Sequence, residues 1–168
     1  MMVKAKIVGK KFSCILLIIL LGSVKLFAQA EKDTTIILIK DVGIQLRTTQ
    51  ALNDMYNFKF DKAEQQFLVI KENYLWHPLP YFLLGLNEWW KIMPNVKDTS
   101  HDEKFLAYMD STILVAENLH EKYPEYRIES AFFLAAAYGF KGRLYADEER
   151  RSWRKAAVVG KTELEYLE

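Results

Sequence analysis

The sequence has almost no cysteine, and its other reactive residues form no catalytic pattern. Cys14 is the only cysteine, so the chain forms no internal disulfide and has no thiol beyond residue 14. No serine lies in a G-x-S-x-G pattern, and there is no glycine-rich phosphate loop. The three histidines, His77, His101 and His120, form no H-E-x-x-H pair. We therefore expect a protein that is not an enzyme, with no catalytic residues, no cofactor and no metal.

The chain also lacks an excess of positive charge. Its formal net charge is +1, from 23 basic and 22 acidic residues. Removing residues 1–30 takes away five lysines and no acidic residue, which leaves a net charge near −4. A mildly acidic domain is not attracted to a phosphate backbone, so we expect no nucleic-acid partner. Apolar residues make up 51% of the chain, enough for a hydrophobic core.

No apolar run is long enough for a stable membrane span, which needs roughly 20 residues. The longest, CILLIILLG at residues 14–22, follows a basic leader with four lysines in residues 4–11 and precedes Ala28-Gln29-Ala30. This order predicts a secretory signal peptide, residues 1–30, cleaved after Ala30, and a periplasmic or secreted protein. A membrane anchor is the alternative. A lipid anchor is disfavoured because Cys14 precedes the apolar run instead of following it.

The sequence has no strand–turn–strand pattern, and its apolar residues recur at helical spacing. Residues 31–43 form a lead-in segment. We expect six helices. The first covers 44–57, the second starts at 61, and the third runs from the prolines at 78 and 80 to about 92. The fourth covers 100–122, the fifth covers 127–143, and the sixth runs from about 148 to the end. Asp61 with Glu64, and Ser100 with Glu103, have the spacing of capping boxes at two helix starts. The predicted fold is all-α.

Small residues recur at matching places in three of these helices. Tyr81, Leu84 and Gly85 form an aromatic-x2-leucine-small pattern, and Ala135 directly follows Leu134 in the same way. Ala51 occupies the small-residue place in the first helix, 34 residues before Gly85. A small side chain lets two helix backbones approach closely, so we expect close backbone contact between helices at these three positions.

This 34-residue period resembles the tetratricopeptide repeat, a helix–turn–helix unit whose first helix carries W/Y-x2-L-G-x2-Y. The resemblance covers residues 44–166, and the chain is also similar to exported bacterial repeat proteins of unassigned role. It departs from the pattern at Glu88, where the family prefers tyrosine, at Gly160, where it prefers an aromatic residue, and over 102–122. The resemblance implies a solenoid of about three antiparallel helix pairs within residues 44–168.

Four apolar residues of the helix that starts at the prolines at 78 and 80 are candidates for partner binding. They are Phe82, Leu86, Trp89 and Trp90. In the related family, such first-helix positions build a concave surface that binds proteins or peptides. Burial of these side chains by the neighbouring repeat is the alternative interpretation.

The sequence thus predicts a protein-protein interaction module or scaffold in a bacterial envelope, with a protein or peptide partner. The alternatives are a helical accessory or regulatory domain of an envelope enzyme, and a small-ligand carrier with an aromatic pocket between helices. Leu164, Tyr166 and Leu167 lie on an uncapped amphipathic helix. We therefore expect a further element to pack there, either because the chain is an N-terminal fragment or because a partner binds.

Overall fold

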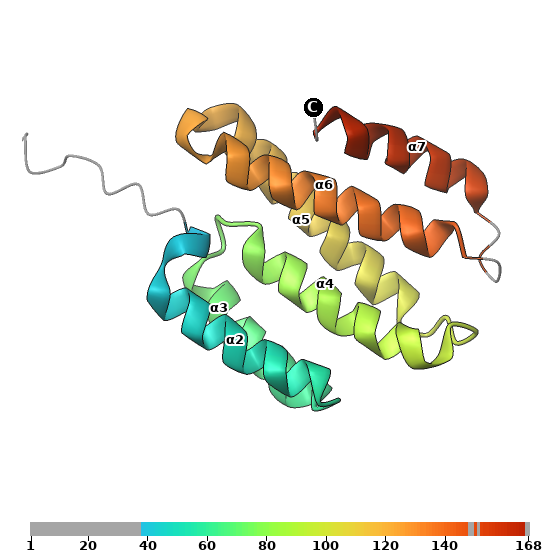
Figure 1. Ribbon diagram of the computed structural model, residues 1–168, viewed down its shortest axis with the longest axis horizontal. Coiled ribbons are helices and arrows are strands. Elements are labelled where there is room, and N and C mark those ends of the chain that lie inside the picture. Colours follow the sequence, from blue (N-terminus) through green and yellow to red (C-terminus); the bar gives the residue numbers. More distant parts are fainter. Residues whose placement is uncertain (1–37, 148–149, 151, 167–168) are drawn as a thin grey trace, which may run out of the picture. The chain divides into compact units, whose positions relative to one another are not determined.

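The computed structural model describes residues 38–147, 150 and 152–166 (Figure 1). In this part of the chain there are six α-helices, three short 3-10 helices and no strand. The elements are η1 (Leu38–Lys40), α2 (Val42–Tyr56), α3 (Phe60–Asn73), α4 (Leu79–Ile92), η2 (Met93–Asn95), α5 (Asp102–Lys122), η3 (Pro124–Tyr126), α6 (Arg127–Tyr145) and α7 (Trp153–Glu165). The predicted signal peptide and most of the lead-in segment lie outside the described residues.

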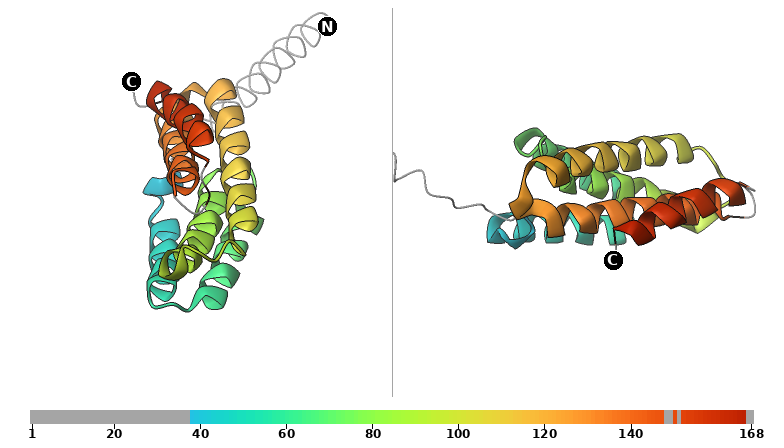
Figure 2. Two further views of the ribbon diagram at one scale, coloured as in Figure 1. Left: turned by 90° about the vertical axis from the view of Figure 1, so that its right-hand side faces the viewer. Right: turned by 90° about the horizontal axis from the view of Figure 1, so that it is seen from above.

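Each α-helix packs against the next one along the chain. The main contacts join α2 to α3, α3 to α4, α4 to α5, α5 to α6, and α6 to α7. Smaller contacts join α2 to α4 and α4 to α6. Figures 1 and 2 show α3 and α5 toward one side of the molecule, and α2, α6 and α7 toward the other. The all-α prediction is confirmed, with six helices packed sequentially in adjacent pairs.

Proline and aspartate explain the starts of two helices. Pro78 is the N-terminal cap of α4 and Pro80 lies in its first turn, as predicted. Asp41 caps α2, because its Oδ1 accepts a hydrogen bond of 2.8 Å from the backbone N–H of Ile44.

The two predicted capping boxes are wrong. The helix α3 begins at Phe60, one residue before Asp61, and its cap is Lys59. The helix α5 begins after His101, which makes no side-chain capping bond. The loop before α5 explains this difference, because the backbone N–H of Ser100 donates to Oδ1 of Asp98. Ser100 thus belongs to a turn and does not cap the helix.

Aromatic residues of α4 and α6 form the centre of the core. The Phe82 ring lies 5.7 Å from that of Phe133 and 5.8 Å from that of Phe140, between ring centroids. Trp89 contacts Phe140 at 5.3 Å and Phe105 of α5 at 5.5 Å. These edge-on and tilted arrangements are the favourable ones for aromatic pairs. They join three helices into one core.

Gly85 lies at a tight helix contact, as the sequence predicts. A Cβ atom at this position would lie 2.5 Å from Cε of Met109 and 3.4 Å from Cβ of Tyr108, both on α5. The atoms that approach Gly85 are therefore side-chain atoms, whereas we expected helix backbones to meet. Ala51 and Ala135 are also buried.

The last helix begins later than predicted, at Trp153. The guanidinium of Arg150, just before it, donates to both carboxylate oxygens of Asp102, at 2.8 and 2.6 Å, and to the carbonyl oxygen of Val96. It also bonds Asp147 at 3.1 Å. Arg150 thus fixes the connection between α6 and α7 to the start of α5.

Candidate functional site

The four predicted partner-binding residues of α4 do not share one exposed surface. Phe82 and Trp89 are each only 8% exposed and belong to the core. Leu86 and Trp90 are half-buried and pack against that core. The Trp90 ring contacts the Tyr56 ring of α2 edge-on, at 5.3 Å. The adjacent tryptophans therefore face two different neighbours, and only Leu86 and Trp90 of the four candidates keep a partly exposed side chain.

A buried carboxylate, Glu88, lies at the centre of a cluster of charged side chains. It is 1% exposed. Its Oε1 lies 2.8 Å from Nζ of Lys91 and 3.0 Å from Nζ of Lys104, and its Oε2 lies 2.9 Å from Nδ1 of His101. Glu64 of α3 bridges the same two lysines, at 3.5 and 2.7 Å. The cluster thus joins α3, α4 and the start of α5.

The charged groups in this cluster shift one another's pKa values. Burial acts to raise the pKa of Glu88, but the hydrogen bonds and charges of Lys91 and Lys104 outweigh it and lower that pKa. Burial acts to lower the pKa of Lys104, but its bonds to Glu64 and Glu88 raise that pKa above its ordinary value. Both groups are therefore held in their charged forms near neutral pH.

The turn between α2 and α3 lies beside this cluster and contains an unusual backbone conformation. Phe58 has φ = 61° and is the only described residue other than glycine with positive φ. Its N–H donates to the carbonyl of Met55, and the N–H of Lys59 donates to the carbonyl of Asp54, both at 2.9 Å. This pair of bonds is the Schellman motif, in which glycine is the usual residue at the left-handed position. A side chain there costs about 1 kcal/mol.

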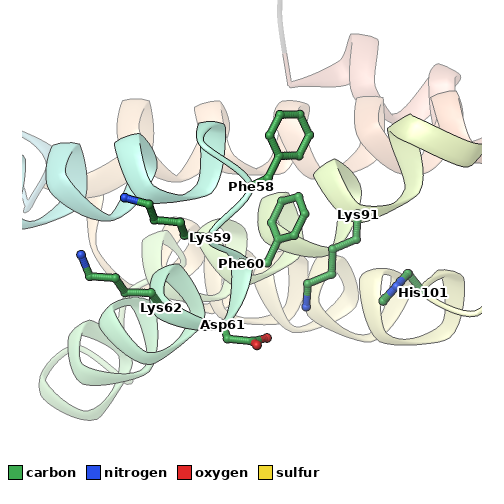
Figure 3. A pocket seen from close by; sticks show the side chains of 7 residues that line it. All are labelled: Phe58, Lys59, Phe60, Asp61, Lys62, Lys91 and His101. Atoms are coloured by element: carbon green, nitrogen blue, oxygen red, sulfur yellow. The ribbon is translucent and has the colours of Figure 1, made fainter.

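Burial of the Phe58 side chain does not offset this cost, since the residue is 66% exposed. Its ring lies edge-on to that of Phe60, with 5.9 Å between centroids. Together the two rings form part of the wall of an open pocket of about 690 Å³. Its lining residues are Phe58, Lys59, Phe60, Asp61, Lys62, Lys91 and His101 (Figure 3).

The basic residues of this pocket are held by carboxylates around it. Figure 3 shows Lys59 and Lys62 on one side of the two rings, and Lys91 and His101 on the other. Asp54 pairs with Lys59 at 3.5 Å and with Lys62 at 3.0 Å. Hydrogen bonds from Gln66 and Lys62 hold the pKa of Asp54 below its ordinary value. The pocket wall thus carries four groups able to bear positive charge and one acidic residue, Asp61.

A second buried ionisable pair, His77 with Glu129, has a structural role. Nδ1 of His77 accepts the backbone N–H of Leu79 at 3.1 Å, so Nε2 carries the ring proton in the neutral tautomer. Nε2 lies 3.1 Å from Oε1 of Glu129, within ion-pair distance, but forms no hydrogen bond. The same Oε1 accepts the N–H of Ile39 at 3.0 Å. The pair therefore ties η1 and the start of α4 to α6.

An apolar groove of about 860 Å³ lies along α6 beside the end of α7. It is lined by Ile128, Ala131, Phe132, Ala135, Ala136, Gly139, Phe140, Arg143, Glu163 and Tyr166. Ile128 is 90% exposed and Phe132 is 57% exposed. Tyr166 closes one side of the groove, because its ring stacks on that of Tyr138 at 6.1 Å and is nearly parallel to it. Sequence reasoning did not predict this groove.

Within the described residues, no group of three or more His, Cys, Asp or Glu side chains could hold a metal ion. Among the same residues, no helix combines the length and the hydropathy that crossing a membrane requires. Comparisons of the chain with known protein families, with curated proteins and with solved structures found no match.

Proposed function

We propose that this chain is an exported, non-enzymatic protein of the tetratricopeptide-like type, whose groove along α6 binds an amphipathic helix of a partner protein. The observation that carries the proposal is the exposure of Ile128 and Phe132 in an apolar groove. Large exposed apolar residues gathered in one groove are typical of an interaction surface. Export is supported by the basic leader, the apolar run and Ala28-Gln29-Ala30.

The choice of a helix as occupant follows from the packing of the rest of the molecule. The pair α2–α3 is covered by α4, and the pair α4–α5 is covered by α6. No described helix covers the pair α6–α7 in this way. A partner helix in the groove would continue the same packing. This is the helix-in-groove mode of recognition, in which apolar residues at i, i+4 and i+7 fill the groove.

The polar residues of the groove indicate the polarity of one end of the partner helix. Arg143 is exposed and Glu163 is half-buried, and neither side chain has an ion-pair or hydrogen-bond partner in the described part of the chain. They lie near the same end, because Glu163 is close to Gly139, one helical turn before Arg143. We therefore expect polar residues on the partner helix at the end that faces Arg143 and Glu163.

The test uses a defined helical peptide and two variants of the protein. A fluorescein-labelled peptide with leucine at i, i+4, i+7 and i+11, and one terminal glutamate, is titrated with the protein while fluorescence anisotropy is recorded. We expect saturable binding, weakened at least tenfold by Phe132→Asp. Leu114→Asp is the matched control, because Leu114 is 69% exposed on α5, away from the groove. Equal loss of binding in both variants, or no saturable binding at all, would contradict the proposal.

A further inference from the structure

The turn between α2 and α3 has an aromatic residue at a position whose backbone conformation favours glycine. Phe58 takes the left-handed conformation of the Schellman motif, with φ = 61°. It is 66% exposed, so burial does not offset the strain. A strained, exposed aromatic residue at the wall of a pocket is typical of a binding site.

The pocket beside Phe58 has the size of a small-molecule site. Its volume of about 690 Å³ lies within the range of ligand pockets in proteins. Phe58 and Phe60 give it an apolar wall, with their rings at 83° to each other. An edge-on pair of this kind leaves ring faces that a flat ligand can contact.

The opposite wall can bind an anionic group. Nζ of Lys91 has three donor positions, and its two neighbouring acceptors are Glu88 and Glu64. One donor position is therefore left for a ligand. His101 directs Nδ1 to Glu88 at 2.9 Å, and its Nε2 has no partner in the described part of the chain. Because the carboxylates around Lys91 and His101 are already engaged, both side chains are held in place beside the rings.

Two lysines on the other side of the rings add further donor groups to the site. Lys59 and Lys62 line the pocket and share a single counter-ion, Asp54. Against these stands one acidic lining residue, Asp61. The lining residues are mainly basic, but Asp54, Glu64 and Glu88 balance the lysine charges from behind. An anion is therefore favoured by the unused donor hydrogens of the lining side chains and not by net charge.

We propose that this pocket binds a small organic anion, in which an aromatic ring is joined to a phosphate or carboxylate group. The ring packs on Phe58 and Phe60, and the anionic group is bound by Lys91 and His101. The site is formed by the α2–α3 turn, the C-terminal end of α4, and His101 directly before α5. It shares no lining residue with the groove along α6, so each of the two proposals can be tested independently of the other.

The test compares ligands that carry both features with ligands that carry one. Phenyl phosphate and 2-naphthoate are titrated by NMR into the protein without its signal segment, alongside inorganic phosphate and benzyl alcohol. We expect the two aromatic anions to bind at least tenfold more tightly than either single-feature compound. Binding of phenyl phosphate alone would assign the site to phosphate esters, and binding of 2-naphthoate alone to carboxylates. Equal affinity for phenyl phosphate and inorganic phosphate would overturn the proposal, and so would failure of both aromatic anions to bind.

Phe58→Gly separates a binding role from a folding role. Glycine suits the left-handed conformation, so we expect this variant to unfold at a higher temperature than the original protein. Its affinity for the aromatic anions should nevertheless fall at least tenfold. Leu114→Ala, which truncates an exposed side chain of α5 outside both the pocket and the groove, should leave that affinity unchanged. If Phe58→Gly bound the anions as tightly as the original protein, the ring would have no role in binding and the inference would be wrong.

Discussion

A single residue, Glu88, places a charged group on a buried face of α4. This chain buries the Glu88 carboxylate and surrounds it with Lys91, His101 and Lys104. Removing one partner from such a cluster leaves the others uncompensated, and that penalty usually exceeds the net value of the intact contacts. The cluster is therefore a sensitive point of the fold.

We expect Glu88→Gln to lower the free energy of unfolding by about 2–3 kcal/mol, because Lys91 and Lys104 lose a charged acceptor in a buried place. Chemical denaturation followed by circular dichroism measures this change. Glu103→Gln is the matched control, since Glu103 lies exposed on the first turn of α5. A loss as small as that of the control would show that the cluster contributes little to stability.

Glu88 also makes stability depend on pH at the acidic side. Its pKa in the folded protein lies below its ordinary value of about 4.5. The folded state therefore binds the proton less readily than the unfolded state, and the stabilisation is complete above about pH 4.5 and lost as pH falls below it. In Glu88→Gln the decrease in stability between about pH 6 and pH 3 should be smaller than in the original protein. An unchanged pH profile would contradict this assignment.

Gly85 offers a second test at a single residue, with Met109 as its contact. Alanine gains up to about 1 kcal/mol of helix propensity over glycine. Its Cβ would lie 2.5 Å from the Met109 methyl group. Because Met109 is fully buried, this methyl group has little room to move aside, and overpacking should outweigh that gain. We expect Gly85→Ala to destabilise the protein by about 1 kcal/mol, and to stabilise it in a Met109→Ala background. A double-mutant cycle of unfolding free energies measures this coupling, and additive effects would refute the contact.

The sequence indicated the special residues only in part. Gly85 followed from the spacing of small residues, since the repeat pattern itself places them at helix contacts. Glu88 was visible only as a departure from that pattern, because its partner Lys104 is 16 residues away and Glu64 lies on another helix. Nothing in the local sequence predicts the left-handed backbone conformation of Phe58, because phenylalanine is rare in that conformation.

At the scale of the helices, the positions of the elements could be predicted well and their first turns poorly. The prolines at 78 and 80 fixed the start of α4, since proline restricts the backbone whatever the tertiary contacts are. The capping boxes failed because the competing bond from Ser100 to Asp98, and the Schellman turn before α3, decide those starts. A cap is a balance among neighbouring hydrogen bonds, and spacing alone does not reveal which one forms.

The helices also differ in how firmly they are held. Ten residues of α4 are buried, including Leu84 and Ile92, whereas none of the described residues of α7 is. Local opening should therefore require less free energy at α7 than at α4. We expect the backbone amides of α7 to exchange with deuterium at least tenfold faster than those of α4. Mass spectrometry of peptide fragments measures this, and equal protection of the two helices would contradict the packing described for α7.

Across the whole molecule, sequential packing of helix pairs leaves one pair, α6–α7, without a following helix among the described residues. The all-α architecture could be predicted because apolar periodicity and proline positions are local signals. The groove could not, because it depends on where α7 ends relative to α6 and on the stacking of Tyr166 against Tyr138. For the same reason the sequence left open which of the candidate residues on α4 are buried, since it does not show which neighbour covers Trp89.

The central claim is that the groove along α6 receives a helix, and chemical-shift mapping by NMR tests it most directly. The protein is titrated with the leucine-bearing helical peptide, and the backbone amide shifts are followed residue by residue. The account predicts the largest shifts at Ile128, Phe132 and Ala136, with none at Leu114. Shifts spread evenly over the surface, or confined to residues outside the groove, would contradict it.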